Sequence, residues 1–144
     1  LATHVERTRR LREGQTLSQA TQTIAEALGV NHAIVPMSDD PVRTQVETEA
    51  GWLVLTHGVG AMRVYSIGAL LLDLDDPTVV LGRLTSPLLT PAPDERSGYV
   101  PNVVYSCGAL VHGRTLVLPY GCSDTESRVA LVDLDRLLDD LRPG

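Results

Sequence analysis

Lysine and phenylalanine are both missing from this chain. Its twelve basic residues are all arginines, and its aromatic residues are one tryptophan and four tyrosines. So few aromatic side chains argue against a stacking platform for single-stranded nucleic acid. Eighteen acidic residues give a net charge of −6 at pH 7, which disfavours nucleic acid as a partner by bulk electrostatics. A small local anion site remains open, since arginine suits phosphate and carboxylate.

Long apolar runs are missing too. No stretch approaches the roughly 18 to 20 apolar residues that span a bilayer, and the first residues, LATHVERTRR, contain no signal-peptide core. We therefore expect a cytoplasmic protein with no membrane partner. The chain begins at Leu1 and not at Met, which we interpret as a trimmed piece. Cys107 and Cys122 are expected to be thiols in a cytosolic chain, and no Cys or His spacing matches a zinc site. We expect no metal and no bound cofactor.

The 144 residues, 43% of them apolar, suffice for one domain with an aliphatic core. Near the N-terminus, residues 16–29 read TLSQATQTIAEALG and predict an amphipathic helix. Thr16 and Gln19 form a capping box there, and Gly29 ends the helix. The following VNHAIVPM, residues 30–37, predicts a short buried strand.

From Val42 onward the apolar pattern has period two, which indicates β-strands. Turn signals every 8 to 12 residues favour antiparallel structure of the kind found in propeller blades, about one and a half blades in all. Open sheet edges then favour a homo-oligomer. The predicted strands are 43–48, 52–57, 62–74, 78–82, 102–111, 115–121 and 127–134, with hairpin loops at 49–51 and 112–114 and a short helix over 134–144.

The stretch ThrHisGlyVal, residues 56–59, is the first candidate site. His57 ends a predicted strand, and Gly58 and Gly60 allow a ligand to approach the backbone. Tyr65 on the next strand can present its hydroxyl on the same side, next to Arg63. An imidazole, a phenol and a guanidinium suit a small oxyanion such as phosphate. The alternative is a half-buried histidine bound to a backbone carbonyl.

Two further stretches place carboxylates in turns. Asp124 follows a strand end in TyrGlyCysSerAsp, where it can accept bonds from two sugar hydroxyls or close an Asx-turn. Asp39 and Asp40 precede Pro41, and such a pair can bind a metal or share a proton, although Asp-Asp-Pro is also a common turn. The similar stretch LeuAspAspPro, residues 74–77, predicts only a turn and no functional site.

Residues 50–141 resemble the C-terminal part of glycoside hydrolase family 130, the β-mannoside phosphorylases and related hydrolases. The resemblance implies a mainly β protein: a five-bladed β-propeller of which this segment forms about the last two blades. It is carried by three stretches, AGWLVLTHGVGAMRVYSIGALLLDLDDPTVVLGRL, SPLLTP and GYVPNVVYSCGALVHGRTLVLPYGCSDTESRVALVDLDRLL.

In that family, inorganic phosphate attacks the anomeric carbon of a mannoside with inversion, and an aspartic acid protonates the leaving oxygen. The resemblance implies that His57 and Tyr65 lie on the phosphate side, although the loop between them is shorter here, and that Asp124 binds hydroxyls of the reacting sugar. It also implies that the general acid lies in the first half of the propeller, which has no counterpart here. No catalytic residue is therefore assigned, and an inverting enzyme is expected only if that half is supplied. The implied partners are a β-mannoside or manno-oligosaccharide and phosphate as co-substrate.

Residues 1–48 resemble another family, 2-phospho-L-lactate transferase, an α/β enzyme of coenzyme F420 biosynthesis. The matching stretches are LATHVERTRRLREGQTLSQATQTIAEALGV and IVPMSDDPVRTQVET. The resemblance implies that Asp39 and Asp40 lie near a substrate cleft, whereas the nucleotide-binding remainder of that family has no counterpart here.

Both families contain a hairpin similar to ValGluThrGluAlaGlyTrpLeu, residues 46–53. We therefore interpret the chain as a chimera of segments 1–48 and 49–144, joined somewhere within 45–53. The leading hypothesis is a fragment of a β-mannoside phosphorylase or glycosidase with partial or no turnover of its own. The alternatives are a phospholactyl transferase-like protein and a non-catalytic β-domain that assembles in pairs.

Overall fold

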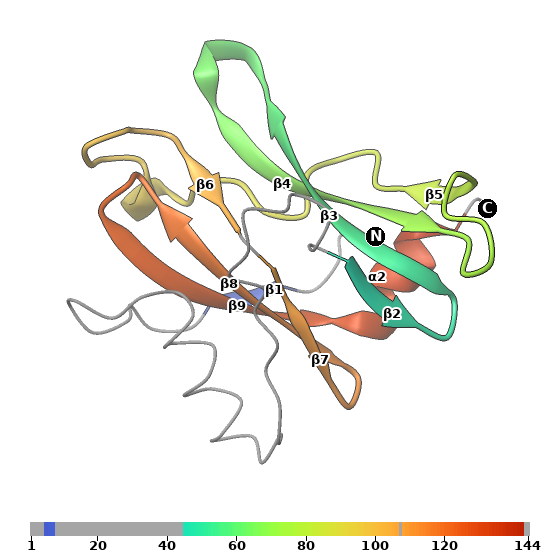
Figure 1. The fold of residues 1–144 in the computed structure, drawn as a ribbon. Helices are drawn as coiled ribbons and strands as arrows, with labels where there is room; N and C mark the ends of the chain where they lie inside the picture. The colour runs from blue at the N-terminus through green and yellow to red at the C-terminus, as the bar shows by residue number, and fades with distance from the viewer. Residues whose placement is uncertain (1–4, 8–44, 107, 143–144) are drawn as a thin grey trace.

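The computed structural model describes residues 5–7, 45–106 and 108–142, and these form two antiparallel sheets and one α-helix (Figure 1). The mainly β class is confirmed. The predicted helix at 16–29, the strand at 30–37 and the candidates Asp39 and Asp40 lie outside the described residues. Among the described residues, no helix is long and apolar enough to cross a membrane.

The first sheet has the strand order β2-β3-β4-β5, and the second has the order β1-β9-β8-β6, with β7 also paired to β8. The strands of the first sheet are β2 (Gln45–Thr48), β3 (Gly51–Val59), β4 (Tyr65–Leu72) and β5 (Val80–Arg83). Those of the second are β1 (Val5–Arg7), β6 (Val104–Tyr105), β7 (Leu110–His112), β8 (Thr115–Cys122) and β9 (Glu126–Asp133). The helices are α2 (Leu134–Leu141) and the short 3₁₀ turns η2 (Ala61–Arg63) and η3 (Pro93–Glu95).

One aliphatic core joins the two sheets and α2. On β3, Leu53 and Leu55 are buried in alternation with partly exposed residues, as a strand with one covered face requires. Each buried leucine contributes about 1.5 to 3 kcal/mol relative to an exposed one. The same core cluster includes Ile67, Ala69 and Leu71 of β4, Leu116, Leu118 and Tyr120 of β8, Ala130 and Val132 of β9, and the leucines of α2.

The C-terminal helix α2 follows β9 directly. Its buried leucines, at 134, 137, 138 and 141, have the spacing of one helical face. Asp133 caps the helix, because its carboxylate accepts a bond of 3.1 Å from the Arg136 amide. The prediction of a short helix at this end is confirmed, although α2 ends at Leu141.

The β2–β3 hairpin lies within the predicted junction. The Thr48 hydroxyl donates to the Gly51 carbonyl at 2.7 Å and accepts from the Ala50 amide at 3.2 Å, which closes a loop of only Glu49 and Ala50. Gly51 has a φ of +147°, and a Cβ there would lie 2.3 Å from the Leu72 carbonyl oxygen. This position therefore requires glycine.

The prediction of one strand over 102–111 is wrong, because β6 and β7 are separate there. Val104 pairs with Cys122 and Leu110 with Val117, so the chain has one residue more than β8 between these pairs. The extra residue makes a bulge, and Gly108, between the two strands, has a φ of +155°. The sequence also did not predict β1, which pairs with the outer edge of β9.

Candidate functional site

His57 and Tyr65 lie on one face of the first sheet. His57 continues the series of core-facing residues on β3 and pairs with Ile67 of β4. Tyr65 is two residues before Ile67, so its side chain emerges on that same face. Diagonal neighbours of this kind are about 7 to 8 Å apart. The register therefore brings the two predicted phosphate-side residues together.

The Ser106 amide fixes the state of the His57 ring. It donates to Nε2 of His57 at 2.9 Å. Only a neutral imidazole with no proton on Nε2 can accept this bond, so Nδ1 carries the proton and is a donor. Partial burial of the ring lowers the pKa of His57 from its ordinary value of 6.5. The partner of Nε2 is a backbone amide, whereas the alternative interpretation expected a backbone carbonyl. The fold therefore holds the His57 ring in its neutral form.

Segment 102–106, which contains β6 of the second sheet, bonds to both candidate residues. The Tyr65 amide donates to the Asn102 carbonyl at 2.9 Å. At the other end, the Ser106 hydroxyl is buried and lies 2.6 Å from the Pro119 carbonyl oxygen of β8. The donor to His57 is therefore anchored to the second sheet.

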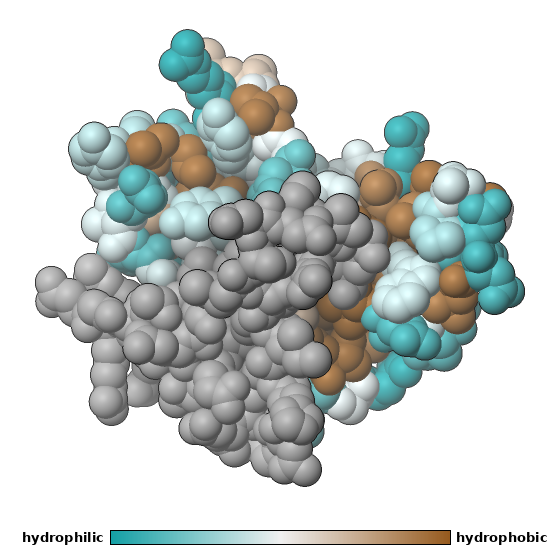
Figure 2. Space-filling view, viewed as in Figure 1, coloured by the Kyte–Doolittle hydropathy of each residue, from teal (hydrophilic) through white to brown (hydrophobic). Residues whose placement is uncertain are grey.

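The β3–β4 hairpin extends beyond this site. Its tip protrudes from the surface and carries hydrophobic beside hydrophilic side chains (Figure 2). Val59 and Met62 there are 61% and 89% exposed, and Met62 and Arg63 both have positive φ. Arg63 is exposed in this tip, two residues before Tyr65 in the sequence.

Asp124 lies in the tight turn between β8 and β9. Ser123 and Asp124 both have a φ of +52°, and the Thr125 amide donates to the Cys122 carbonyl at 3.2 Å. Positive φ at both central residues is the pattern of a type I′ turn. The Ser123 amide donates to the Val103 carbonyl at 2.8 Å, so the turn is bonded to segment 102–106.

The Asp124 side chain is exposed and makes no hydrogen bond or ion pair with any residue that the structure describes. The Asx-turn alternative is therefore not found, because the backbone bond of Thr125 already closes this turn. Such a carboxylate is available to a ligand with hydroxyl groups.

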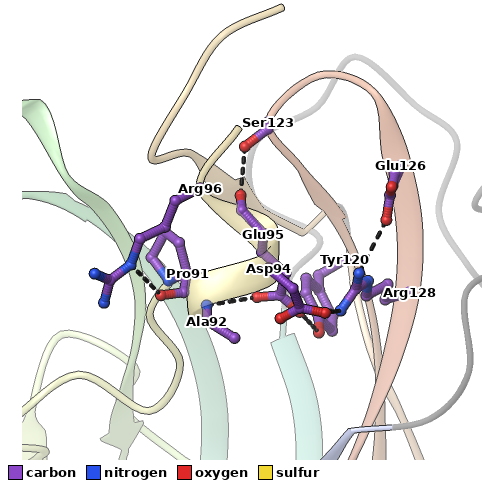
Figure 3. A network of polar contacts seen from close by, with 9 residues as sticks. All are labelled: Pro91, Ala92, Asp94, Glu95, Arg96, Tyr120, Ser123, Glu126 and Arg128. Atoms are coloured by element: carbon purple, nitrogen blue, oxygen red, sulfur yellow. Dashed lines mark hydrogen bonds and ion pairs between the residues drawn. The ribbon is translucent and has the colours of Figure 1, made fainter. Parts of the chain in front are cut away.

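The buried residue Glu95 lies next to the turn and bonds to it through its main chain (Figure 3). The Glu95 carboxylate accepts from the Ala92 amide at 2.8 Å and from the Tyr120 hydroxyl at 2.6 Å. Arg128 donates to it at 3.1 Å. The Ser123 hydroxyl donates to the main-chain carbonyl of Glu95. The turn that carries Asp124 is therefore bonded both to η3 and to segment 102–106.

Arg128 is the cation of this network and also contacts Asp94 at 2.9 Å and Glu126 at 3.0 Å. Its Nε is buried and has no hydrogen-bond partner among the residues that the structure describes. Cys122 is a free thiol beside these carboxylates, and burial raises its pKa to about 11, so it is not nucleophilic at neutral pH. Sequence reasoning missed Glu95, whose partner Tyr120 lies 25 residues away in the sequence. In the part of the chain that the structure describes, no three His, Cys, Asp or Glu residues are arranged to hold a metal ion.

Comparison with known proteins decides the family. The model of the beta-1,4-mannooligosaccharide phosphorylases, glycoside hydrolase family 130, matches residues 40–142. The chain belongs to this family. A similar curated member is the beta-1,2-mannobiose phosphorylase of Listeria innocua, 48% identical over 81 residues, which cover 56% of this chain and 23% of that protein. The solved structure of a beta-1,2-mannobiose phosphorylase from Listeria innocua, in complex with beta-1,2-mannobiose, matches with a TM-score of 0.65 and 41% identity, over 69% of this chain and 28% of that one.

A second family matches the N-terminal part. The model of 2-phospho-L-lactate transferase matches residues 1–66. The transferase of Haloarcula marismortui is 40% identical over 96 residues, which cover 56% of this chain and 29% of that protein. The two family models overlap at residues 40–66, and this range includes the predicted junction within 45–53. The match to both families fits the interpretation of a chimera.

The chain spans less than a third of the length of these relatives from either family. The family assignment therefore concerns this segment. The activity of whole family 130 proteins does not follow from it.

Proposed function

We propose that this chain carries the phosphate-binding side and part of the sugar-binding side of an inverting β-mannoside phosphorylase site. The observation that carries the proposal is the bond from the Ser106 amide to His57. It holds a neutral imidazole on the face that Tyr65 shares, and it comes from the segment that also holds the turn of Asp124.

The chemistry of these groups fits phosphate and sugar. With Nε2 occupied by the Ser106 amide, Nδ1 of His57 is a donor, and the Tyr65 hydroxyl is a second donor on the same face. Both suit the oxygens of inorganic phosphate, and Arg63 adds positive charge. Asp124 is an acceptor for sugar hydroxyls.

In phosphorolysis with inversion, a phosphate oxygen forms a bond to the anomeric carbon as the bond to the leaving oxygen breaks on the opposite face. A β-mannoside then gives α-mannose 1-phosphate and the released sugar, which takes up one proton. The proton donor is assigned by resemblance to a part of the family fold outside the matched residues 40–142. The residues described here therefore bind and orient the reactants.

The two sheets fit neighbouring propeller blades, β2 to β5 in one and β6 to β9 with β1 in the other. We infer that they correspond to about the last two blades of a five-bladed propeller. We further infer two segments, 1–48 and 49–144, with the N-terminal one inherited from the transferase family.

The test is an incubation of the chain with β-1,4-mannobiose and phosphate, followed by measurement of mannose 1-phosphate. We expect no release by the chain alone, together with calorimetric binding of phosphate that weakens in Tyr65→Phe and not in Tyr105→Phe. Brisk release would contradict the missing acid, and an absence of phosphate binding would contradict the phosphate site.

The match of residues 1–66 to 2-phospho-L-lactate transferase favours a second candidate function. In that case the chain binds a deazaflavin, with Asp39 and Asp40 near the ligand. A fluorescence titration with a deazaflavin tests this, and affinity should fall in Asp39→Ala and Asp40→Ala. A flat titration of the unchanged chain would remove the candidate.

A further inference from the structure

Residues 98–100 lie directly against the turn that carries Asp124. The Tyr99 amide donates to the Thr125 hydroxyl at 3.1 Å, and the Val100 amide donates to the Ser123 carbonyl at 3.1 Å. Gly98 permits this approach, because a Cβ there would lie 2.5 Å from the Thr125 hydroxyl and 2.6 Å from the Ser123 carbonyl oxygen. Bonds to the residues on both sides of Asp124 thus place Tyr99 beside it.

The fold does not use the side chain of Tyr99. It is 85% exposed, and its hydroxyl bonds to no residue that the structure describes. By contrast, Tyr120 is fully buried and donates to Glu95. A large exposed ring on a backbone fixed at two points is a preorganised contact for a ligand. Single exposed apolar residues are common in proteins, so exposure alone does not mark Tyr99 as a ligand contact. The neighbouring carboxylate of Asp124 is what distinguishes this position.

Tyr99 and Asp124 together have the chemistry of a sugar site. A pyranose ring has hydroxyl groups around its edge and C–H groups on its faces. A carboxylate accepts from the hydroxyls, and the negative face of a phenol ring attracts the weakly positive C–H groups. Tyrosine also loses little conformational entropy when it contacts a ligand, since it has two side-chain torsions.

The turn that carries Asp124 is held by several hydrogen bonds. Ser123 is 1% exposed, its hydroxyl donates to the Glu95 carbonyl, and its amide donates to Val103. Glu95, also 1% exposed, is held by the bonds shown in Figure 3. Asp124 and Tyr99 therefore sit on one fixed support, as a binding pair requires.

We propose that Tyr99 is a sugar-binding residue: its ring packs against a C–H face of the mannosyl unit whose hydroxyls bind Asp124. This inference rests on the proposed function, because it takes the β-mannoside from there. It adds a specific aromatic contact that the resemblance did not assign, in a chain whose only other exposed tyrosines are Tyr65 and Tyr105.

The experiment is an NMR titration of the full chain with β-1,4-mannobiose, with Tyr99→Ala, Tyr99→Phe and Asp124→Asn as variants. Leu74→Ala is a matched control, since Leu74 is also an exposed apolar residue, in the loop after β4 of the other sheet. We expect the Kd to rise about tenfold in Tyr99→Ala, as for removal of an aromatic ring that stacks on a ligand. It should stay within about twofold in Tyr99→Phe, which keeps the ring, and in the control.

The thermal midpoint should change little in all of these variants, because each substituted side chain is exposed. Saturation-transfer signals should also appear on sugar C–H protons with the unchanged chain and decrease in Tyr99→Ala. If Asp124→Asn weakens binding and Tyr99→Ala does not, the inference about Tyr99 is wrong and the proposed function stands. If the unchanged chain does not bind the mannoside, both are overturned.

Discussion

The amide of Ser106 and the ring of His57 belong to different sheets, yet they form one hydrogen bond of 2.9 Å. This bond requires an unprotonated Nε2, and partial burial lowers the pKa of His57. The ring is then a donor through Nδ1 only. At the scale of residues, function depends on this protonation state, since the neutral ring adds a hydrogen-bond donor without adding charge.

Stability should depend on pH through His57. Its folded-state pKa lies below the unfolded value of about 6.5, so the unfolded chain binds the proton first as the pH falls. The contribution of His57 to the free energy of unfolding is complete above about pH 6.5 and decreases as the pH falls below it. Urea unfolding at several pH values, compared with His57→Gln, measures this. The free energy of unfolding of the unchanged chain should exceed that of His57→Gln by less as the pH falls. A difference between the two proteins that is constant with pH would contradict this prediction.

Glu95 should contribute more to stability than Asp94, although both bind Arg128. The Glu95 side chain is fully buried and that of Asp94 is 68% exposed. Replacement of Glu95 removes the buried acceptor of the Tyr120 hydroxyl and the Ala92 amide and costs about 3 kcal/mol, whereas an exposed ion pair contributes less than about 1 kcal/mol. Chemical denaturation of Glu95→Ala and Asp94→Ala measures both. Equal losses in the two variants would refute the network as the support of the Asp124 turn.

At the scale of elements, strand β5 is in close contact with helix α2 at Gly82. A Cβ there would lie 1.6 Å from the backbone carbonyl oxygen of Leu141, which cannot move without the helix. We expect Gly82→Ala to lower the free energy of unfolding by about 2 kcal/mol. Gly58→Ala is the control, because its nearest atom is the Ser66 hydroxyl at 3.5 Å, and its change should stay within about 0.5 kcal/mol. Denaturation curves that coincide for the two variants would show that the helix does not pack there.

Elements with strong local signals could be predicted from the sequence. Period two predicted the strands on both sides of the Glu49–Ala50 loop, and the short C-terminal helix was also predicted. The bulge between β6 and β7 could not be predicted, because it depends on the register against β8. Of the site, His57, Tyr65 and Asp124 were found by residue type and resemblance. Ser106, Glu95 and Tyr99 were missed, since their partners lie 25 to 49 residues away in the sequence.

At the scale of the whole molecule, the stretch that both family models match contributes to the core. The overlap of their matches contains β2 and β3, and β3 contributes Leu53 and Leu55 to the core cluster. At the other end, Val5–Arg7, within the transferase match, pairs with β9. The pairings and the core fit a chain whose two segments fold together.

Self-association should follow from the open edge of the first sheet. The edge strand β5 carries Val80, 54% exposed, next to Val79, 45% exposed. Unpaired edges with apolar residues favour strand pairing between copies, and a lysine there opposes it. Light scattering after size exclusion should show oligomers that decrease in Val80→Lys. A monomer at every concentration of the unchanged chain would contradict this expectation.

The central claim is that one surface binds phosphate at His57 and a mannoside at Asp124. The most direct measurement is an NMR titration of the chain, His57→Ala and Asp124→Asn, each with inorganic phosphate and with β-1,4-mannobiose. The account predicts that the unchanged chain binds both ligands, that His57→Ala loses phosphate and keeps the mannoside, and that Asp124→Asn does the reverse. No binding of either ligand by the unchanged chain, or equal loss of both ligands in each folded variant, would contradict it.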